Sequence, residues 1–353
     1  MRSSSPRVVP VYDLPSPSQH SHTASHSPLL PKSGSRSSSS QRRAWRPAAI
    51  ARAIVVVDAL LVFYSANAAA AAGSTNFCSM ASNASERSCQ AGAQSDFWIA
   101  LAKCDNLSKA ADRKACQQQA QAELSDALQA CDTQNDARDA VCKQLGSAPY
   151  DPVIDPKKFS ATITNQYLPM TPGTTFVYES NLGEHNEVVV TNNTKKILGA
   201  DCREVRDTVK VNGELTEDTR DWFCQDMDGN VWYFGENANQ IAGGLVVGVE
   251  GSWTAGVDGA KPGIGMKAYP AVGDVYRQEY LPGVAEDMGE VLSVTESVTL
   301  TNFGTLTNCV KTKDTSPLEP DVVEHKFYCP GIGLVRTVDL STGEISDLIS
   351  KTP

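Results

Sequence analysis

The sequence predicts an α+β protein in which a disulfide-stapled helical hairpin precedes a duplicated, mainly antiparallel β-sheet domain, folded as a curved sheet or half-barrel. Three observations carry this prediction: cysteines spaced symmetrically in an Ala- and Gln-rich segment, short β-favouring runs separated by Gly and Pro, and two similar halves among those runs. The expected divisions are a disordered Ser/Pro/Arg-rich segment at 1–47, a signal peptide or membrane anchor at 48–72, a Cys-rich helical hairpin at 76–146, a linker at 147–158, and β-units at 159–260 and 261–353.

The N-terminal segments indicate export. Residues 1–47 hold too little apolar surface to offset the entropy of ordering. Several arginines then precede an apolar run at 54–64, which is followed by Ala66-Asn67-Ala68, the pattern of a secretory signal peptide. We expect cleavage near Ala68 and a secreted or periplasmic protein. The alternative is an uncleaved single-pass anchor lengthened by the alanines up to Ala72, in which case this segment alone contacts the membrane.

Charge and cysteine content exclude some classes of function. The chain carries 31 Lys and Arg against 41 Asp and Glu, and residues 1–68 hold only two of the acids, Asp13 and Asp58, so the rest of the chain is strongly acidic. Nucleic acid is therefore not an expected partner, because phosphate binding needs a basic face. The ten cysteines include no Cys-x-x-Cys pair, so disulfides in an oxidising compartment explain them better than zinc does.

Six of the cysteines predict the helical hairpin. They form three pairs with one shared midpoint, residue 110, and residues equidistant from a turn lie at equal height in two antiparallel helices. The other connectivities remain open from sequence alone. The favoured pairs are Cys78–Cys142, Cys89–Cys131 and Cys104–Cys116.

The β-region is organised around residues 222–236, WFCQDMDGNVWYFGE, which predict a hairpin because Asp, Gly and Asn in the middle accept turn conformations. Residues 325–335 repeat the order of aromatic residue, cysteine, glycine turn and apolar strand. This repetition predicts two β-units with one cross-strand disulfide each, Cys202–Cys224 and Cys309–Cys329. A pairing between the units, such as Cys202–Cys329, remains open.

Several of these motifs occur in one order, namely YLPMTPGTTFVY at 167–178, DWFCQDMDGNVWYFGE at 221–236, GSWTAGVDGAKPGIGM at 251–266 and FYCPGIGLV at 327–335. With these motifs in this order, the chain resembles a group of uncharacterised bacterial secreted β-rich proteins. The last motif is also similar to the final strands of lipoprotein-carrier half-barrel envelope domains. That similarity implies a concave sheet able to hold an apolar ligand, and neither resemblance implies catalytic residues.

The Gly-rich stretch 241–265, together with the aromatic hairpin, is where we expect a ligand site, because long Gly-rich loops in compact domains are commonly functional. A core role for the aromatic residues is the alternative. The candidate ligand-binding residues are Trp222, Trp232, Phe234, Glu236, Trp253, Asp258 and Met266.

Two weaker patterns in the sequence are candidates for metal binding or catalysis. Asp226, Asp228 and Asn230 form the start of a calcium-loop pattern, but a hairpin turn explains them without a metal. Glu184/His185 and Glu324/His325 are candidate acid–base or ligand pairs, although adjacent strand residues point to opposite faces. We therefore expect no metal, cofactor or catalytic residue.

The sequence thus predicts an exported cell-envelope or secreted protein that acts as a non-catalytic binding or structural module. Its expected partner is an apolar small molecule, held in the concave sheet, or an envelope protein. The alternative is a secreted hydrolase or metal-dependent enzyme that uses Glu184/His185 or Glu324/His325.

Overall fold

A computed structural model describes residues 75–353. The predicted disordered segment, signal peptide and anchor lie outside this range. In the described range, no helix combines the length and apolar character that crossing a bilayer requires.

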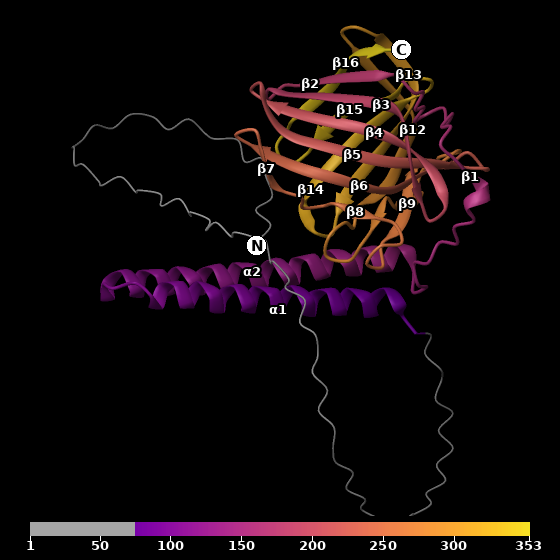
Figure 1. The fold of residues 1–353 in the computed structure, drawn as a ribbon. Coiled ribbons are helices and arrows are strands. Elements are labelled where there is room, and N and C mark those ends of the chain that lie inside the picture. The colour runs from indigo at the N-terminus through magenta and orange to yellow at the C-terminus, as the bar shows by residue number, and fades with distance from the viewer. Residues whose placement is uncertain (1–74) are drawn as a thin grey trace, which may run out of the picture. The chain divides into compact units, whose positions relative to one another are not determined.

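The first described part is a pair of antiparallel helices, α1 (Phe77–Asp105) and α2 (Ala110–Leu145) (Figure 1). The Asn76 side chain caps α1 by accepting a hydrogen bond from the backbone N–H of Ser79, and α2 ends at Gly146, whose φ is 87°. Between the helices, Arg113 donates to the carbonyl oxygens of Leu107 and Ser108. The tight turn lies where the cysteine symmetry placed it.

Disulfides hold this hairpin together at three heights, and each cysteine bonds the partner that the sequence predicted. Few large apolar side chains are buried between the helices, since Leu124 and Val141 are buried while Trp98 and Ile99 are 63% and 56% exposed. So small an apolar core stabilises the hairpin only weakly, and the three disulfides supply the additional stability that it needs.

The second part is a strongly curved antiparallel sheet (Figure 1). Its order within the described range is β10-β12-β13-β14-β15-β16-β2-β3-β4-β5-β6-β9-β11, with β1 beside β5 and with β7 and β8 beside β6. The strands are β1 (Phe159–Ser160), β2 (Thr175–Ser180), β3 (Glu184–Ile197), β4 (Ala200–Val211), β5 (Glu214–Asp226), β6 (Val231–Ala242), β7 (Leu245–Gly248), β8 (Trp253–Thr254), β9 (Lys261–Met266), β10 (Val275–Arg277), β11 (Glu279–Tyr280), β12 (Met288–Leu300), β13 (Gly304–Ser316), β14 (Glu319–Cys329), β15 (Gly333–Asp339) and β16 (Ile345–Thr352). A short 3-10 helix, Pro156–Lys158, precedes β1.

The sheet is nearly closed and barrel-like. Its two terminal strands in this order, β10 and β11, are consecutive in the chain, and they pair with β12 and β9 respectively. On the other side, β16 pairs with β2. The α+β fold class, with a stapled hairpin ahead of a curved antiparallel sheet, is therefore confirmed.

The two halves of the sheet carry their disulfides at corresponding positions. Cys202–Cys224 joins β4 to β5 in the first half, and Cys309–Cys329 joins β13 to β14 in the second. Both pairs are those expected within, rather than between, the predicted units. The duplication itself stays a prediction, and this strand order is the one that a duplication would give.

Two apolar clusters fill the domain. The larger one contains the fully buried Val231, Met266, Val291, Val310 and Val335. The smaller cluster surrounds the Cys202–Cys224 disulfide and includes Trp222, Phe234 and Trp253. Phe159 packs edge-on against Trp232 and Phe234, so the segment that enters the sheet covers part of this second cluster.

Candidate functional site

The β5–β6 turn is built by one carboxylate. Asp226 Oδ1 accepts hydrogen bonds from the backbone N–H groups of Asp228 and Asn230, and its Oδ2 accepts from the Asn230 amide and the Trp232 indole. The Asn230 side-chain oxygen in turn accepts from the backbone of Ala268. These oxygens hold the turn together, as the hairpin interpretation requires.

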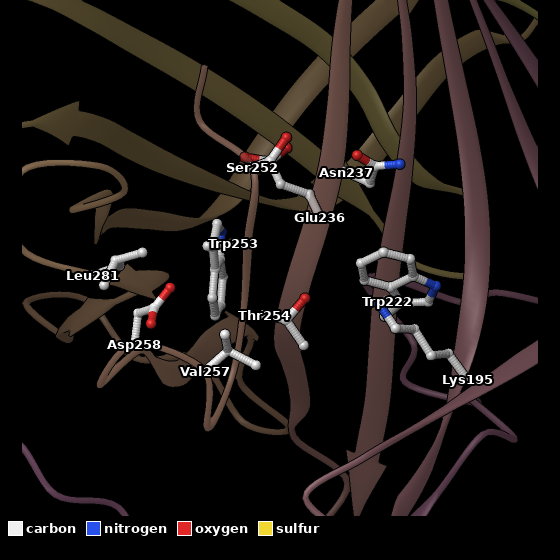
Figure 2. Close-up of a pocket in the computed structure, with 10 residues that line it drawn as sticks. All are labelled: Lys195, Trp222, Glu236, Asn237, Ser252, Trp253, Thr254, Val257, Asp258 and Leu281. Carbon is white, nitrogen blue, oxygen red and sulfur yellow. The ribbon is translucent and has the colours of Figure 1, made fainter. Parts of the chain in front are cut away.

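A pocket of about 440 Å³ lies beside β6, where this strand pairs with the two-residue strand β8 (Figure 2). We call it the Trp222–Trp253 pocket. Val257 and Asp258 are exposed at its rim, so it opens to solvent. Its lining residues are Lys195, Trp222, Glu236, Asn237, Ser252, Trp253, Thr254, Val257, Asp258 and Leu281.

Trp222 and Trp253 are two of the four apolar residues that line this pocket, beside Val257 and Leu281. Trp222 and Trp253 are 5% and 4% exposed, and Figure 2 shows them on either side of Glu236. Lys195 Nζ lies 3.3 Å from the centroid of the Trp222 ring, a cation–π distance, and partial burial lowers the pKa of Lys195. The indole N–H of Trp222 has no hydrogen-bond partner among the described residues, and that of Trp253 approaches the Glu279 carboxyl without normal hydrogen-bond geometry.

Glu236 belongs to a hydrogen-bonded group of three side chains. Its Oε2 lies 3.2 Å from the Tyr233 hydroxyl, and Asp221 Oδ1 lies 2.5 Å from the same hydroxyl. A phenol has one hydrogen to donate, so when both contacts are hydrogen bonds one carboxyl must donate its own proton to the phenolic oxygen. Burial favours a protonated carboxyl here, because it raises the pKa of both Asp221 and Glu236 to about 8.

More acidic side chains share the inner face of the sheet with this group. Asp221 pairs across the strands with Val205 of the larger apolar cluster on one side and with Glu236 on the other, so all three point inward. Asp207, two residues beyond Val205, has the same orientation, and burial and the charge of Asp221 raise its pKa to about 8. One part of the interior is thus apolar and another is acidic.

Four of the seven candidate ligand residues line the Trp222–Trp253 pocket: Trp222, Glu236, Trp253 and Asp258. The other three lie elsewhere. Phe234 and Met266 have no exposed surface and belong to the two apolar clusters, while Trp232 is held by Asp226 and Phe159. Ligand binding by these residues stays a prediction.

The sequence did not single out the polar residues that complete the pocket. Ser252 and Thr254 flank Trp253 inside the Gly-rich stretch, so their position carried a signal. Lys195 of β3 and Leu281, after β11, reach the pocket only through long-range strand pairing, for which the local sequence gives no indication.

The two Glu–His pairs are separated in the structure. His185 Nδ1 lies 2.7 Å from Glu179 Oε1 of the neighbouring strand, whereas Glu184 points to the opposite face of β3. Burial raises the pKa of Glu184, and the charges of Glu344, Glu217 and Glu324 raise it further. His325 pairs with Lys313, and burial and the nearby Lys311 and Lys313 lower its pKa.

Across residues 75–353, no three His, Cys, Asp or Glu side chains are grouped so that they could hold a metal ion. This includes Asp226 and Asp228, the weak calcium candidates. The side chains that line the Trp222–Trp253 pocket can supply stacking, hydrogen bonds and charge.

The chain was compared with known proteins. No family model and no curated protein matches it. Two solved structures are similar in part: a Bacteroides fragilis protein with a YmcC-like fold that is proposed to be exported, at 15% identity and a TM-score of 0.33, and a proposed lipoprotein of Parabacteroides distasonis, at 14% identity and a TM-score of 0.30. The first match covers 54% of this chain and 100% of the other, and the second covers 53% and 99%.

Proposed function

We propose that this protein is an exported, non-catalytic binding module that holds a small, partly apolar molecule in the Trp222–Trp253 pocket. The observation that carries the proposal is a solvent-open pocket of about 440 Å³ with a nearly buried tryptophan on each side of Glu236. Ligand sites are concave and combine apolar contact area with placed polar groups. This pocket has both, since its lining includes two tryptophans, a valine and a leucine beside six polar or charged residues.

Each part of the lining has a distinct role in this proposal. The faces of Trp222 and Trp253 supply apolar contact area at a low cost in side-chain entropy. Asn237, Ser252 and Thr254 supply hydrogen bonds that orient the ligand. Glu236, whose pKa of about 8 keeps it largely protonated at neutral pH, acts as a hydrogen-bond donor.

Export is supported by the disulfides. All the cysteines lie in the described range, and none is free. Such bonds persist in the periplasm or outside the cell, and the basic and apolar run before Ala68 provides a route there. An uncleaved anchor would place the same domain at the membrane surface.

The enzymatic alternative receives less support. Each Glu–His pair would have to bring both side chains to one reacting atom, yet the two members of each pair lie on opposite faces of their strand. Elemental analysis of the purified protein tests this alternative directly, since a stoichiometric divalent metal would favour it over a binding module.

A neutral fluorescent dye such as Nile red tests the proposed function in the full chain. We expect saturable binding that Val257→Trp reduces about tenfold or more, because a large ring at the exposed rim fills the pocket without disturbing the core. Trp253→Phe should weaken binding less. Trp98→Phe, on an exposed residue of α1, is the matched control and should bind as the unmodified chain does. Equal binding by Val257→Trp would contradict the proposal.

A further inference from the structure

A second pocket, of about 510 Å³, lies between the open end of the helical hairpin and the β-domain. We call it the Arg277 pocket. Phe77, Val141 and Leu145 line it from the helices, and Ile264 and Tyr280 line it from the sheet. Its walls are thus largely apolar, and it shares no lining residue with the Trp222–Trp253 pocket.

The feature that requires explanation is Arg277. It is 8% exposed, yet no carboxylate of the described residues lies within ion-pair distance of it. Within residues 75–353, the hydrogen-bond partners of its Nη atoms are the sulfur atoms of Met288 and Cys78, at 4.0 and 3.9 Å, and its Nε has no hydrogen-bond partner. Burial lowers the pKa of this guanidinium, which nevertheless remains charged at neutral pH.

Aromatic rings hold Arg277 in place without neutralising it. Its guanidinium carbon lies 4.6 Å from the ring centroid of Tyr280 and 5.6 Å from that of Tyr150. Tyr150 is itself fixed by donating to the carbonyl oxygen of Pro262. The arginine is therefore positioned by its surroundings, while its strongest hydrogen-bonding capacity stays unused.

A second arginine in the same pocket is only partly satisfied. Arg138 of α2 makes a bidentate ion pair with Glu286, at 2.8 and 2.9 Å, but its Nη1 has no hydrogen-bond partner in the described part of the chain. Two arginines and one glutamate leave the pocket with one uncompensated positive charge. A buried charge without a partner is costly, so the site is complementary to a single negative charge.

We propose that the Arg277 pocket binds an anionic amphiphile, a single carboxylate or similar monoanion on an apolar chain. The anionic group accepts hydrogen bonds from Arg277, with the free Nη1 of Arg138 as a further donor in the pocket. The apolar chain lies against the helical side chains, including Phe77 and Val141. Neither the disulfide-stapled hairpin nor the β-domain alone provides this site.

Calorimetric titration of the full chain with decanoate, below its micelle concentration, tests the proposal. Decanoate should bind with a stoichiometry of one, whereas 1-decanol and decyltrimethylammonium, which have the same chain with a neutral or a cationic head, should bind about tenfold or more weakly. Equal binding of all three would overturn the proposal, because the positive charge would then play no part.

Variants locate the site. Arg277→Gln should weaken decanoate binding about tenfold or more, while Arg87→Gln, the same change on an exposed arginine of α1, should leave it unaltered. Ala81→Phe, which fills the pocket and keeps both arginines, should also abolish binding. Thermal unfolding without ligand checks the folding of each variant, and Arg277→Gln should not lower the midpoint, because it removes an unpaired charge.

The outcome for this pocket is distinguishable from that for the proposed function. Decanoate binding that survives Arg277→Gln but is lost in Val257→Trp would place the anion in the Trp222–Trp253 pocket and overturn this inference. Loss of Nile red binding in Val257→Trp, with decanoate binding intact, would support both proposals.

Discussion

The Tyr233 hydroxyl lies 2.5 Å from Asp221, across two neighbouring strands, and this short contact joins a tyrosine to a carboxyl whose pKa is raised by burial to about 8. The contact lies on the inner face of the sheet, with Glu236 on its other side at 3.2 Å. It connects the interior of the sheet to the Trp222–Trp253 pocket, because Glu236 belongs to both.

Stability should fall as pH rises through the neutral range. Burial is the largest cause that raises the folded-state pKa values of Asp207, Asp221 and Glu236 to about 8, against 3.8 to 4.5 in the unfolded chain. Between these limits the folded state binds more protons, so the free energy of unfolding decreases with pH, in total by ~2 kcal/mol or more. Chemical denaturation at pH 5 and pH 8 measures the difference.

The matched variant for this pH effect is Asp221→Asn, which keeps a hydrogen-bonding partner for Tyr233 and removes the titration. Its stability should change less between pH 5 and pH 8 than that of the unmodified chain. Acids with lowered pKa values, such as Asp218 and Asp339, act in the opposite direction but below about pH 4. A stability that rises from pH 5 to pH 8 would contradict the expectation.

The ion pair between Arg138 and Glu286 should be costly to break from one side. Both side chains are nearly buried, at 6% and 4% exposure, and Glu286 Oε1 also accepts from the backbone of Gly283. Glu286→Gln leaves the guanidinium without its counter-charge and should lower the free energy of unfolding by ~3–5 kcal/mol. Urea denaturation provides the measurement.

Two comparisons distinguish this ion pair from ordinary surface charge. Asp201→Asn breaks the pair with Lys196, whose side chains are 60% and 63% exposed, and should cost less than ~1 kcal/mol. The double variant Arg138→Met, Glu286→Leu should recover much of the loss, since it leaves no unpaired charge. A Glu286→Gln variant as stable as the unmodified protein would show that the ion pair does not help to hold α2 against the β-domain.

The cysteines give a direct test of the covalent framework. Thiol titration of the unfolded, unreduced protein should detect almost no free thiol, and all ten cysteines should react after reduction. Replacing Cys202 and Cys224 together by serine should lower the free energy of unfolding by ~2–4 kcal/mol. Most thiols reacting before reduction would argue against the disulfides and against an oxidising compartment.

Gly235 should be far less tolerant of a side chain than Gly92. A Cβ at Gly235, whose φ is +139°, would lie 2.5 Å from the Trp253 carbonyl oxygen and 2.8 Å from Thr254 Cα. Gly235→Ala should therefore displace β8, weaken Nile red binding and destabilise the fold. Gly92→Ala, in α1 with open space around it, should stabilise by ~0.5–1 kcal/mol. Thermal unfolding and dye titration distinguish the two.

Local signals account for what the sequence predicted. The common midpoint of the cysteine pairs gave the helical hairpin and its turn, and the Asp226–Asn230 residues gave the β5–β6 turn. The extended strands carry weaker local signals, since a long strand such as β3 includes a polar stretch in its middle. β9 and β16 have no clear strand pattern, because Pro, Gly and Lys in Lys261–Met266, and the polar residues in Ile345–Thr352, look locally like loops.

Only part of the Trp222–Trp253 pocket could be predicted from the sequence. Trp222, Glu236, Trp253 and Asp258 lie in or beside the aromatic and Gly-rich segments that drew attention. Lys195 and Leu281 join them through strand pairings that no local pattern encodes, and the unpaired charge of Arg277 depends on which residues happen not to face it. The tertiary structure determines both the lining of the pocket and the missing partner of Arg277, so composition and spacing could not predict them.

The pairing of β16 with β2 has a consequence for how the chain reaches its folded form. The two strands are about 170 residues apart in the sequence, so a large loop must close before their ladder can begin. Until then, β2 and β16 each present an unpaired edge, because β16 pairs locally with β15, and an unpaired edge is an open template for joining another copy of the chain. A chain that ends just before residue 345, through interrupted synthesis or proteolysis, would lack β16 and would keep an exposed strand edge permanently.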